Sequence, residues 1–256
     1  MTSTLKKISR RVALTLAVSA CFSPVTQAAE LLTEGVFKVG MEVTYPPFES
    51  YDSNNNIVGL DPEFAALIAQ HLQAKPQLID TKFTSLILGI GKKYDAVISG
   101  MDITPERSKQ VAFTDPYYAN SAVVIAKKGA YTSFDQLKGK RIGMENGTTH
   151  QKYLQDKHPE VKTVAYDSYQ NAIIDLKNGR IDGVFGDTAV VNEWLKTNPQ
   201  LGVATDKVTD PQYFGTGLGI AVRPDNKALL EKLNSALAAI KADGTYQKIS
   251  DQWFPQ

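Results

Sequence analysis

Short apolar runs alternate with amphipathic segments along most of the chain, which is typical of an α/β fold. The apolar runs are continuous rather than alternating, as expected for strands buried on both faces of a parallel sheet. We expect strands at residues 36–41, 96–98, 122–126, 142–144 and 181–185. We expect helices at residues 61–72 and 172–176, and two more within residues 227–253 that are separated at Gly244.

A weak internal repeat accompanies this alternation. Residues 87–100 (ILGIGKKYDAVISG) and 174–187 (IDLKNGRIDGVFGD) share a helix end, a basic residue, an aspartate, an apolar strand and a polar tip. With a constant offset, Asp95 falls on Asp182 and Gly100 falls on Asp187. The repeat predicts two similar lobes whose strand tips face each other across a cleft, where open α/β sheets bind ligands.

The N-terminal segment is expected to be a secretory signal peptide rather than part of the fold. Four basic residues within positions 6–11 precede a short apolar stretch at residues 12–22, and residues 23–28 resemble a cleavage region ending at Ala28. Two alternatives stay open. Residues 18–21 resemble a lipoprotein signal that leaves Cys21 lipidated, and residues 9–11 resemble a twin-arginine signal.

Removal of this segment changes the charge of the chain and its cysteine chemistry. Taking four basic residues from 28 leaves 24 against 27 acidic residues, a net charge of −3 with no basic patch that suggests nucleic acid. Cys21 is the single cysteine, so the mature chain has no internal disulfide, thiolate metal site or cysteine nucleophile. We also expect no membrane span, because no second long apolar stretch follows.

Residues 94–107 (YDAVISGMDITPER) carry a first candidate site. They predict a buried strand followed at once by a helix, with Thr104 as N-cap and Pro105 at the first helical position. Arg107 in the first turn then opposes the helix dipole, which indicates a nearby anion such as a ligand carboxylate. The alternative is a surface arginine paired with Glu106 or Asp102.

Aromatic and acidic side chains follow the first strand. The consecutive prolines at positions 46 and 47 force the chain out of the sheet there, which projects Glu42 and Tyr45 at a strand tip, with Phe83 at a similar strand end. Two aromatic faces and a carboxylate suit a flat cation such as a guanidinium. The alternative is that both rings are ordinary packing residues.

Residues 146–149 (NGTT) offer free backbone N–H groups and two hydroxyl groups at a helix start, which is an anion site. The alternative is simple N-capping by Thr148. Asp187, at the end of its strand, is suited to accept an ammonium group or to cap the helix that begins at Thr188.

Together these motifs resemble the periplasmic solute-binding proteins of ABC importers for polar amino acids, in particular the lysine/arginine/ornithine- and arginine-binding group. The resemblance covers essentially the whole mature chain. It rests on the segments TYPPF at residues 44–48, GLD at 59–61, YDA at 94–96, ITPER at 103–107, FTDPYY at 113–118, GMENGTT at 143–149 and GTY at 244–246.

The resemblance implies a role for each candidate residue at the α-carbon end of an amino acid ligand. Arg107 matches the arginine that clamps the α-carboxylate, with Thr148 and Thr149 assisting. Asp187 matches the aspartate that takes the α-ammonium. Residues around the same end are Ser99 and Gly100, which would act mainly through backbone groups, and Asp102.

The side-chain end of the ligand is matched in the same way. Tyr45 and Phe83 match the aromatic pair that flanks the ligand side chain, and Glu42 matches the acid that pairs with its distal cation. Glu145 is a weaker candidate for that end. The segment that follows Phe83 (residues 86–91) departs from the family pattern and is expected to affect the placement of this ring.

The implied fold is the two-lobed α/β periplasmic binding protein fold (type II). Lobe 1 comprises residues 29–118 plus 218–256, and lobe 2 comprises residues 119–217, with hinges near residues 118–121 and 212–217. The implied protein is a monomer without cofactor or metal. It captures a cationic L-amino acid, arginine foremost, in the periplasm and delivers it to a membrane permease.

Two alternatives accompany this interpretation. One is a broad binder of lysine, arginine, ornithine and histidine. The other is an exported enzyme on the same scaffold, such as an amino acid dehydratase or lyase. The chain offers only His71, His150 and His158 for proton transfer, and of these only His150 lies near the proposed cleft. No recognised catalytic motif is present, which favours binding over catalysis.

Overall fold

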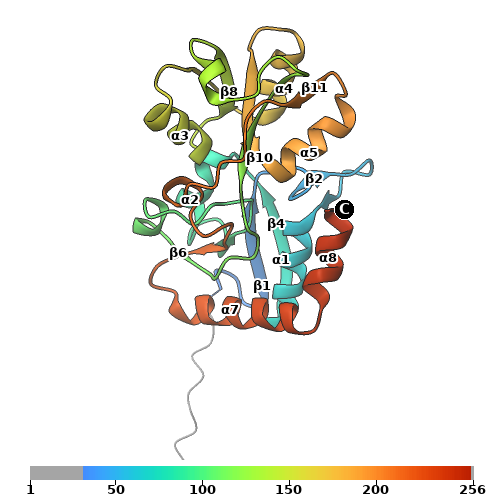
Figure 1. Ribbon diagram of the computed structural model, residues 1–256. Helices are drawn as coiled ribbons and strands as arrows, with labels where there is room; N and C mark the ends of the chain where they lie inside the picture. The colour runs from blue at the N-terminus through green and yellow to red at the C-terminus, as the bar shows by residue number, and fades with distance from the viewer. Residues whose placement is uncertain (1–30, 255–256) are drawn as a thin grey trace, which may run out of the picture.

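The structure, a computed structural model, describes residues 31–254. The predicted signal peptide and Cys21 lie outside the described residues. Two lobes, each built around a five-stranded mixed sheet, lie one above the other (Figure 1). The predicted α/β class and two-lobed architecture are confirmed.

Lobe 1 contains the sheet with strand order β4-β1-β5-β12-β6. Its strands are β1 (Val36–Met41), β4 (Lys75–Asp80), β5 (Ala96–Val97), β6 (Ala112–Phe113) and β12 (Ala221–Val222). Its helices are α1 (Leu60–His71), α2 (Leu86–Gly89), α7 (Lys227–Ala242) and α8 (Thr245–Trp253), with the 3₁₀ turns Phe83–Ser85 and Arg107–Lys109. A small antiparallel hairpin is formed by β2 (Ser50–Tyr51) and β3 (Ile57–Val58).

Lobe 2 repeats this plan with the sheet order β11-β7-β10-β8-β9. Its strands are β7 (Ala122–Lys127), β8 (Arg141–Glu145), β9 (Lys162–Tyr166), β10 (Gly183–Asp187) and β11 (Leu201–Val203). Its helices are α3 (Thr149–Lys157), α4 (Tyr169–Lys177) and α5 (Thr188–Thr197), with the short 3₁₀ helix Phe134–Leu137. The short helix α6 (Pro211–Phe214) packs against α3.

The helices follow from apolar residues at helical spacing. In α7, the buried side chains of Leu229, Leu233, Leu237 and Ile240 recur every three or four residues and form one stripe. Helix α7 packs on α1 along the bottom of the lobe, and α8 contacts both helices at the right of the view (Figure 1). Gly244 adopts φ 81° between α7 and α8, the left-handed conformation that glycine tolerates best, so the predicted break is confirmed.

The internal repeat reflects a shared structural device. Asp95 precedes β5, and its carboxylate accepts a hydrogen bond from the backbone N–H of Lys38 in β1 at 2.8 Å. Asp182 precedes β10, and its carboxylate accepts one from the N–H of Arg141 in β8, also at 2.8 Å. In each lobe the aspartate therefore ties the start of one parallel strand to its neighbour, which fixes their register.

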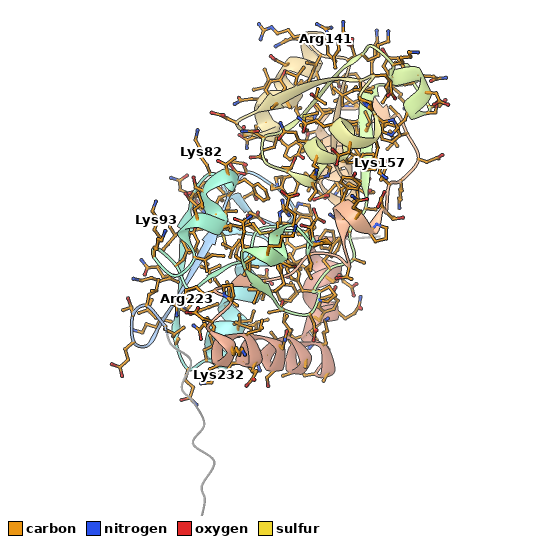
Figure 2. All side chains as sticks on the ribbon, turned by 90° about the vertical axis from the view of Figure 1, so that its left-hand side faces the viewer. Lys82, Lys93, Arg141, Lys157, Arg223 and Lys232 are labelled. Carbon is orange, nitrogen blue, oxygen red and sulfur yellow. The ribbon has the colours of Figure 1, made fainter. Side chains whose placement is uncertain are left out.

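The chain crosses between the lobes twice, once between β6 and β7 and once between β11 and β12. The two crossing segments pair with each other through Tyr118 and Leu218, whose backbone N–H···O distance is 2.8 Å. The segments predicted as hinges, near residues 118–121 and 212–217, are parts of these crossing segments, and their role as hinges stays a prediction. In the side view of Figure 2 the labelled basic side chains are spread over both lobes.

Two local predictions need correction. Residues 104–107 do not open a full α-helix, because the helical turn there is a 3₁₀ turn of three residues, Arg107–Lys109. Thr104 still accepts a hydrogen bond from the Arg107 N–H at 3.1 Å, as an N-cap would. The predicted start of α1 at Asp61 is also inexact, since Gly59 is the N-cap and Asp61 lies inside the helix.

Within residues 31–254, no helix is both long and apolar enough to cross a membrane. The same residues contain no group of histidine, cysteine, aspartate or glutamate side chains suited to hold a metal ion.

Candidate ligand-binding site

A small cavity between the lobes brings the predicted site residues together. All eleven candidates from the sequence line it, and Glu49, His150 and Tyr169 complete the wall. Lobe 1 contributes the residues that follow β1 and β5 and those near the two 3₁₀ turns. Lobe 2 contributes the residues at the ends of β8 and β10 and at the starts of α3 and α4.

Arg107 is buried in this cavity, so the alternative of a surface arginine is wrong. Its Nη1 donates a hydrogen bond to the backbone carbonyl of Asp102 at 3.1 Å, and its guanidinium carbon lies 5.4 Å from the centroid of the Phe83 ring. Among the described residues no carboxylate lies within 4.0 Å of the guanidinium nitrogens. Burial lowers the pKa of Arg107, while the charges of Asp102 and Asp187 oppose that shift. The remaining N–H groups are suited to a carboxylate.

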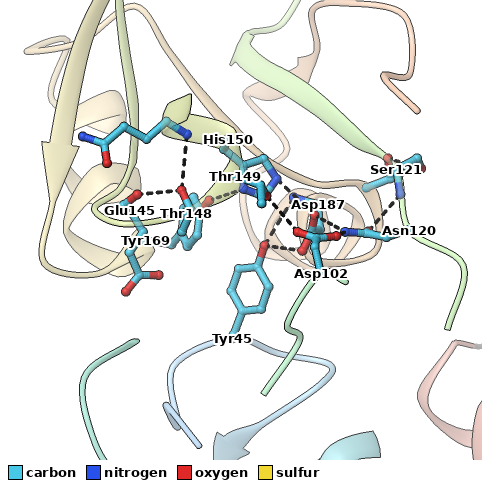
Figure 3. Close-up of polar contacts among 12 residues, drawn as sticks. Tyr45, Asp102, Asn120, Ser121, Glu145, Thr148, Thr149, His150, Tyr169 and Asp187 are labelled. Atoms are coloured by element: carbon cyan, nitrogen blue, oxygen red, sulfur yellow. Dashed lines mark hydrogen bonds and ion pairs between the residues drawn. The ribbon is translucent and has the colours of Figure 1, made fainter. Parts of the chain in front are cut away.

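Asp187 accepts hydrogen bonds on both carboxylate oxygens (Figure 3). Its Oδ2 accepts from the Tyr45 hydroxyl group at 2.8 Å, and its Oδ1 accepts from the Asn120 side chain at 2.7 Å. Although Asp187 precedes α5, its side chain makes no capping hydrogen bond, so the capping alternative is wrong. The carboxylate instead faces the cavity, 1 % exposed, with neutral hydrogen-bond donors around it.

Tyr45 crosses from lobe 1 to lobe 2. Its ring stacks on Tyr169 with centroids 5.2 Å apart, and burial raises its pKa well above the ordinary tyrosine value. The hydroxyl group therefore stays protonated and donates to Asp187. Phe83, by contrast, keeps its ring near Arg107, so the unusual segment after it leaves the ring in the cavity wall.

Asp102 also links the two lobes and lies beside Asp187 (Figure 3). Its Oδ2 accepts from the Thr149 hydroxyl group at 2.8 Å, and its Oδ1 accepts from Asn120 at 2.8 Å. Burial and the negative charge of Asp187 together raise its pKa to about 7. Asn120, in a crossing segment, thus bridges both aspartates with one amide group.

The start of α3 lies at the cavity wall as predicted. Thr148 is the N-cap of the helix, and its side chain accepts from the Gln151 N–H and donates to the carbonyl of Glu145 at 2.7 Å. Capping therefore occurs, and it also orients the helix start toward the cavity. The first N–H groups of a helix lack intrahelical partners and carry partial positive charge, which favours an anion.

Two glutamates from opposite lobes form a second acidic group in the cavity. Glu42 follows β1 and Glu145 ends β8, and their carboxyl groups lie close enough to influence each other's pKa. Burial, followed by the contact with Glu42, raises the pKa of Glu145 to about 10, so it carries a proton at neutral pH. Its Oε1 is buried without a hydrogen-bond partner among the described residues.

Two further buried carboxylates, those of Glu49 and Asp61, hydrogen-bond to the segment that contains Ser99 and Gly100. The Ser99 hydroxyl group accepts from the Glu42 N–H at 3.0 Å and donates to Glu49 at 2.7 Å. The Gly100 N–H donates to Asp61 at 2.8 Å. Because this N–H group is already bonded to Asp61, only the carbonyl oxygen of Gly100 remains for the predicted backbone contact with a ligand.

Sequence reasoning missed three residues of the wall and one that supports it. Glu49 follows the proline turn, Tyr169 opens α4, and Asn120 lies in a crossing segment, with no motif that marks any of them. The sequence analysis places His150 near the cleft but predicts no role for it in binding. It directly follows the predicted Thr148 and Thr149, and that adjacency is the signal that places it in the wall.

Comparison with known proteins agrees with this geometry. The "ABC transporter arginine-binding protein 1" of Escherichia coli (strain K12) is 73% identical over 241 residues, which cover 94% of this chain and 97% of that protein. The histidine-binding periplasmic protein of the same organism is 32% identical over 253 residues, covering 96% and 97%.

A solved structure shares the arrangement of both lobes. It is a Salmonella typhimurium periplasmic binding protein described as having high arginine specificity, with a TM-score of 0.83 and 50% identity. The match covers 86% of this chain and 99% of the solved chain.

The family assignment follows from a match along almost all of the described chain. A sequence model of the bacterial extracellular solute-binding proteins, family 3, matches residues 37–256. The relatives are binding proteins rather than enzymes, so the prediction that this chain is not an enzyme is confirmed. The chain belongs to family 3 of the bacterial extracellular solute-binding proteins.

Proposed function

We propose that this protein captures L-arginine in the periplasm and delivers it to the permease of an ABC transporter. The observation that carries the proposal is the charge pattern of the cavity. One buried guanidinium group lies near Asp187 and Asp102, and a separate pair of glutamates faces the same space. The names of the most similar relatives support the same ligand.

The α-carbon end of arginine would be held by Arg107 and Asp187. The guanidinium group of Arg107 and the start of α3, with Thr148 and Thr149, suit the α-carboxylate. Asp187 suits the α-ammonium, which would replace the hydroxyl group of Tyr45 on Oδ2. Matching both ligand charges matters because an unpaired charge in a buried site is costly.

The side chain of arginine would lie between the rings of Tyr45 and Phe83. Its guanidinium group would then reach Glu42 and Glu145, whose carboxyl oxygens supply acceptors from both lobes. A guanidinium group has five N–H donors in a planar fork, so two carboxyl groups satisfy it better than they satisfy a neutral amide. The unpartnered Oε1 of Glu145 is one of these acceptors.

Capture would involve closure of the lobes about the paired crossing segments near Tyr118 and Leu218. Contacts between side chains of the two lobes support such closure. One of them is the ion pair between Lys82 of lobe 1 and Asp167 of lobe 2, at 3.1 Å. Figure 2 shows Lys82 at the upper edge of lobe 1. The closed monomer would present both lobe surfaces to the permease. Residues 1–28 would direct export, with Sec as the proposed route.

A thermal unfolding screen tests the proposal. The mature chain is unfolded with L-arginine, L-lysine, L-ornithine, L-histidine and L-glutamine, each at the same concentration. A ligand at 100 times its dissociation constant adds about 2.7 kcal/mol of stability. We expect L-arginine to raise the midpoint temperature of thermal unfolding more than any other ligand in the screen. If L-glutamine gives the largest rise, the distal pocket recognises a neutral amide and the proposal is wrong. Equal rises with the four cationic or imidazole ligands would instead favour the broad binder.

A further inference from the structure

His150 occupies an unusual place behind the ammonium site. It is the second residue of α3 and only 2 % exposed, and its ring lies between two other residues of the cavity wall (Figure 3). Nδ1 lies 2.9 Å from the Tyr169 hydroxyl oxygen, and Nε2 lies 3.0 Å from Asp187 Oδ1. The ring edges and faces contact Phe185 and Phe214, with centroids 5.0 and 5.5 Å away. The imidazole is therefore held at Nδ1 and on its apolar sides, with Nε2 close to the Asp187 carboxylate.

The two oxygens of Asp187 face different partners. Oδ1 faces His150 and Asn120, while Oδ2 faces Tyr45. The approach of Nε2 to Oδ1 is close but is not aligned as a hydrogen bond in this structure. A small rotation of the carboxylate would align it, and such a rotation becomes possible once Oδ2 exchanges the Tyr45 hydroxyl group for another donor.

We propose that His150 is a positioning residue for Asp187 and thereby sets the affinity for the α-ammonium group of the ligand. This inference rests on the proposed function. Nε2–H donates to Oδ1, Nδ1 accepts from the Tyr169 hydroxyl group, and Oδ2 is presented to the ligand. In this tautomer the ring gives the carboxylate one hydrogen bond at Oδ1 and leaves the lone pairs of Oδ2 for the ammonium. The ligand carboxylate and side chain make no use of His150.

The role predicts that His150 matters only for ligands that carry an α-ammonium group. Calorimetric titration of wild type and His150→Leu is carried out with L-arginine and with δ-guanidinovalerate, which is arginine without its amino group. We expect the leucine variant to lose on the order of 10-fold or more in arginine affinity, since a hydrogen bond to a charged group is removed. For δ-guanidinovalerate we expect a loss below about 3-fold.

Two further variants separate positioning from packing. The side-chain amide of glutamine can place a donor near the position of Nε2, so His150→Gln should retain most of the arginine affinity. The amide of asparagine reaches only the position of Nδ1, so His150→Asn should lose affinity like the leucine variant. This pair also decides the matter if the leucine variant does not fold. His71→Leu, at the exposed end of α1, is the matched control and should change neither affinity.

Equal weakening of both ligands by His150→Leu would show that the residue only supports the fold of the wall, and the inference would be overturned. Loss of arginine affinity in His150→Gln equal to that in His150→Asn would overturn it as well. Both results leave arginine binding by the wild type intact. If the wild type binds neither ligand, the proposed function itself fails and this inference falls with it.

Discussion

Glu42 and Glu145 are two cavity residues whose carboxyl pKa values are raised by their surroundings. They come from opposite lobes, and both are more than nine-tenths buried. The raised pKa of each follows first from burial, and Glu145 is shifted further by Glu42. A cation placed between them stabilises the charged form of both carboxyl groups and so opposes both shifts, which favours a ligand guanidinium group there.

The Glu145→Gln variant tests this view through stability. The pKa of Glu145 is about 10 in the folded chain against an ordinary value of 4.5. The folded chain therefore retains a proton that the unfolded chain releases above pH 4.5, and stability without ligand falls as pH rises from there toward 10. Glutamine removes this dependence. We expect the variant to be more stable at pH 7 by up to about 3 kcal/mol and to bind arginine more weakly.

The measurement is the thermal unfolding midpoint of wild type and variant between pH 4 and pH 9, without ligand. The difference should vanish near pH 4 and grow with pH. Glu231→Gln, on the exposed side of α7, is the matched control and should follow wild type throughout. A Glu145→Gln curve that stays parallel to wild type would contradict the assignment of the proton.

Arg107→Ala tests the carboxylate end of the site. Removing one partner of a buried charge pair leaves the other charge without compensation, so we expect the variant to lose roughly 2–5 kcal/mol of arginine binding free energy. Isothermal titration calorimetry measures it. Arg180→Ala is the control, because Arg180 forms an exposed ion pair with Asp175 that contributes little. Unchanged arginine affinity in Arg107→Ala would remove this residue from the site.

At the scale of elements, the turn that carries Phe83 is held by Tyr94. The Tyr94 hydroxyl group donates to the carbonyl oxygens of Leu86 at 2.7 Å and Ser85 at 3.1 Å, at the start of α2. Gly89 ends α2 directly against this tyrosine, since an added Cβ atom would lie 2.2 Å from the hydroxyl oxygen. The segment that departs from the family pattern is therefore packed around one aromatic side chain.

Gly89→Ala should displace Tyr94 and with it the turn that bears Phe83. We expect a loss of about 1–3 kcal/mol in the free energy of unfolding, as for other overpacked sites, together with weaker arginine binding. Urea unfolding and calorimetry measure the two effects. Gly202→Ala, in β11, is the control, because its added Cβ atom would meet its nearest neighbour at an ordinary 3.4 Å. Equal stability of the two variants would contradict this packing argument.

Much of this arrangement was predictable from local patterns. The strands β1, β7 and β8 and the helices α7 and α8 follow from apolar runs and from Gly244, because burial and backbone conformation act locally. The 3₁₀ turn at Arg107 was not predictable as such, since Thr104 and Pro105 suit the start of a long helix and a single turn equally. Asp61 was assigned to a helix start, but its hydrogen bonds go to Gly100 and Tyr117, which lie far away in sequence.

In the candidate site, too, residues with a local role could be predicted, whereas residues whose role depends on distant parts of the chain could not. Residues that belong to motifs, such as Arg107 and Thr148, were found because their local roles are visible in the sequence. Asn120, Glu49 and Tyr169 were missed, because their roles arise only when the two lobes meet. His150 lies between these cases, since it adjoins a motif in α3 but approaches Asp187, which ends β10, at 3.0 Å.

At the scale of the whole molecule, the fold places opposite charges on the facing edges of two similar lobes. Each lobe has the same order of three parallel strands, and in each an aspartate ties two of these strands together. The crossing segments pair near Tyr118 and Leu218, so the lobes share one narrow connection. An amino acid between them would be held by residues from both sides.

A crystal structure of the mature chain grown with L-arginine tests this account most directly. We predict one arginine in the cavity, with its α-carboxylate on Arg107, its α-ammonium on Asp187 and its guanidinium group between Glu42 and Glu145. An arginine bound elsewhere, or one bound in the cavity with its guanidinium group at Asp187, would contradict it.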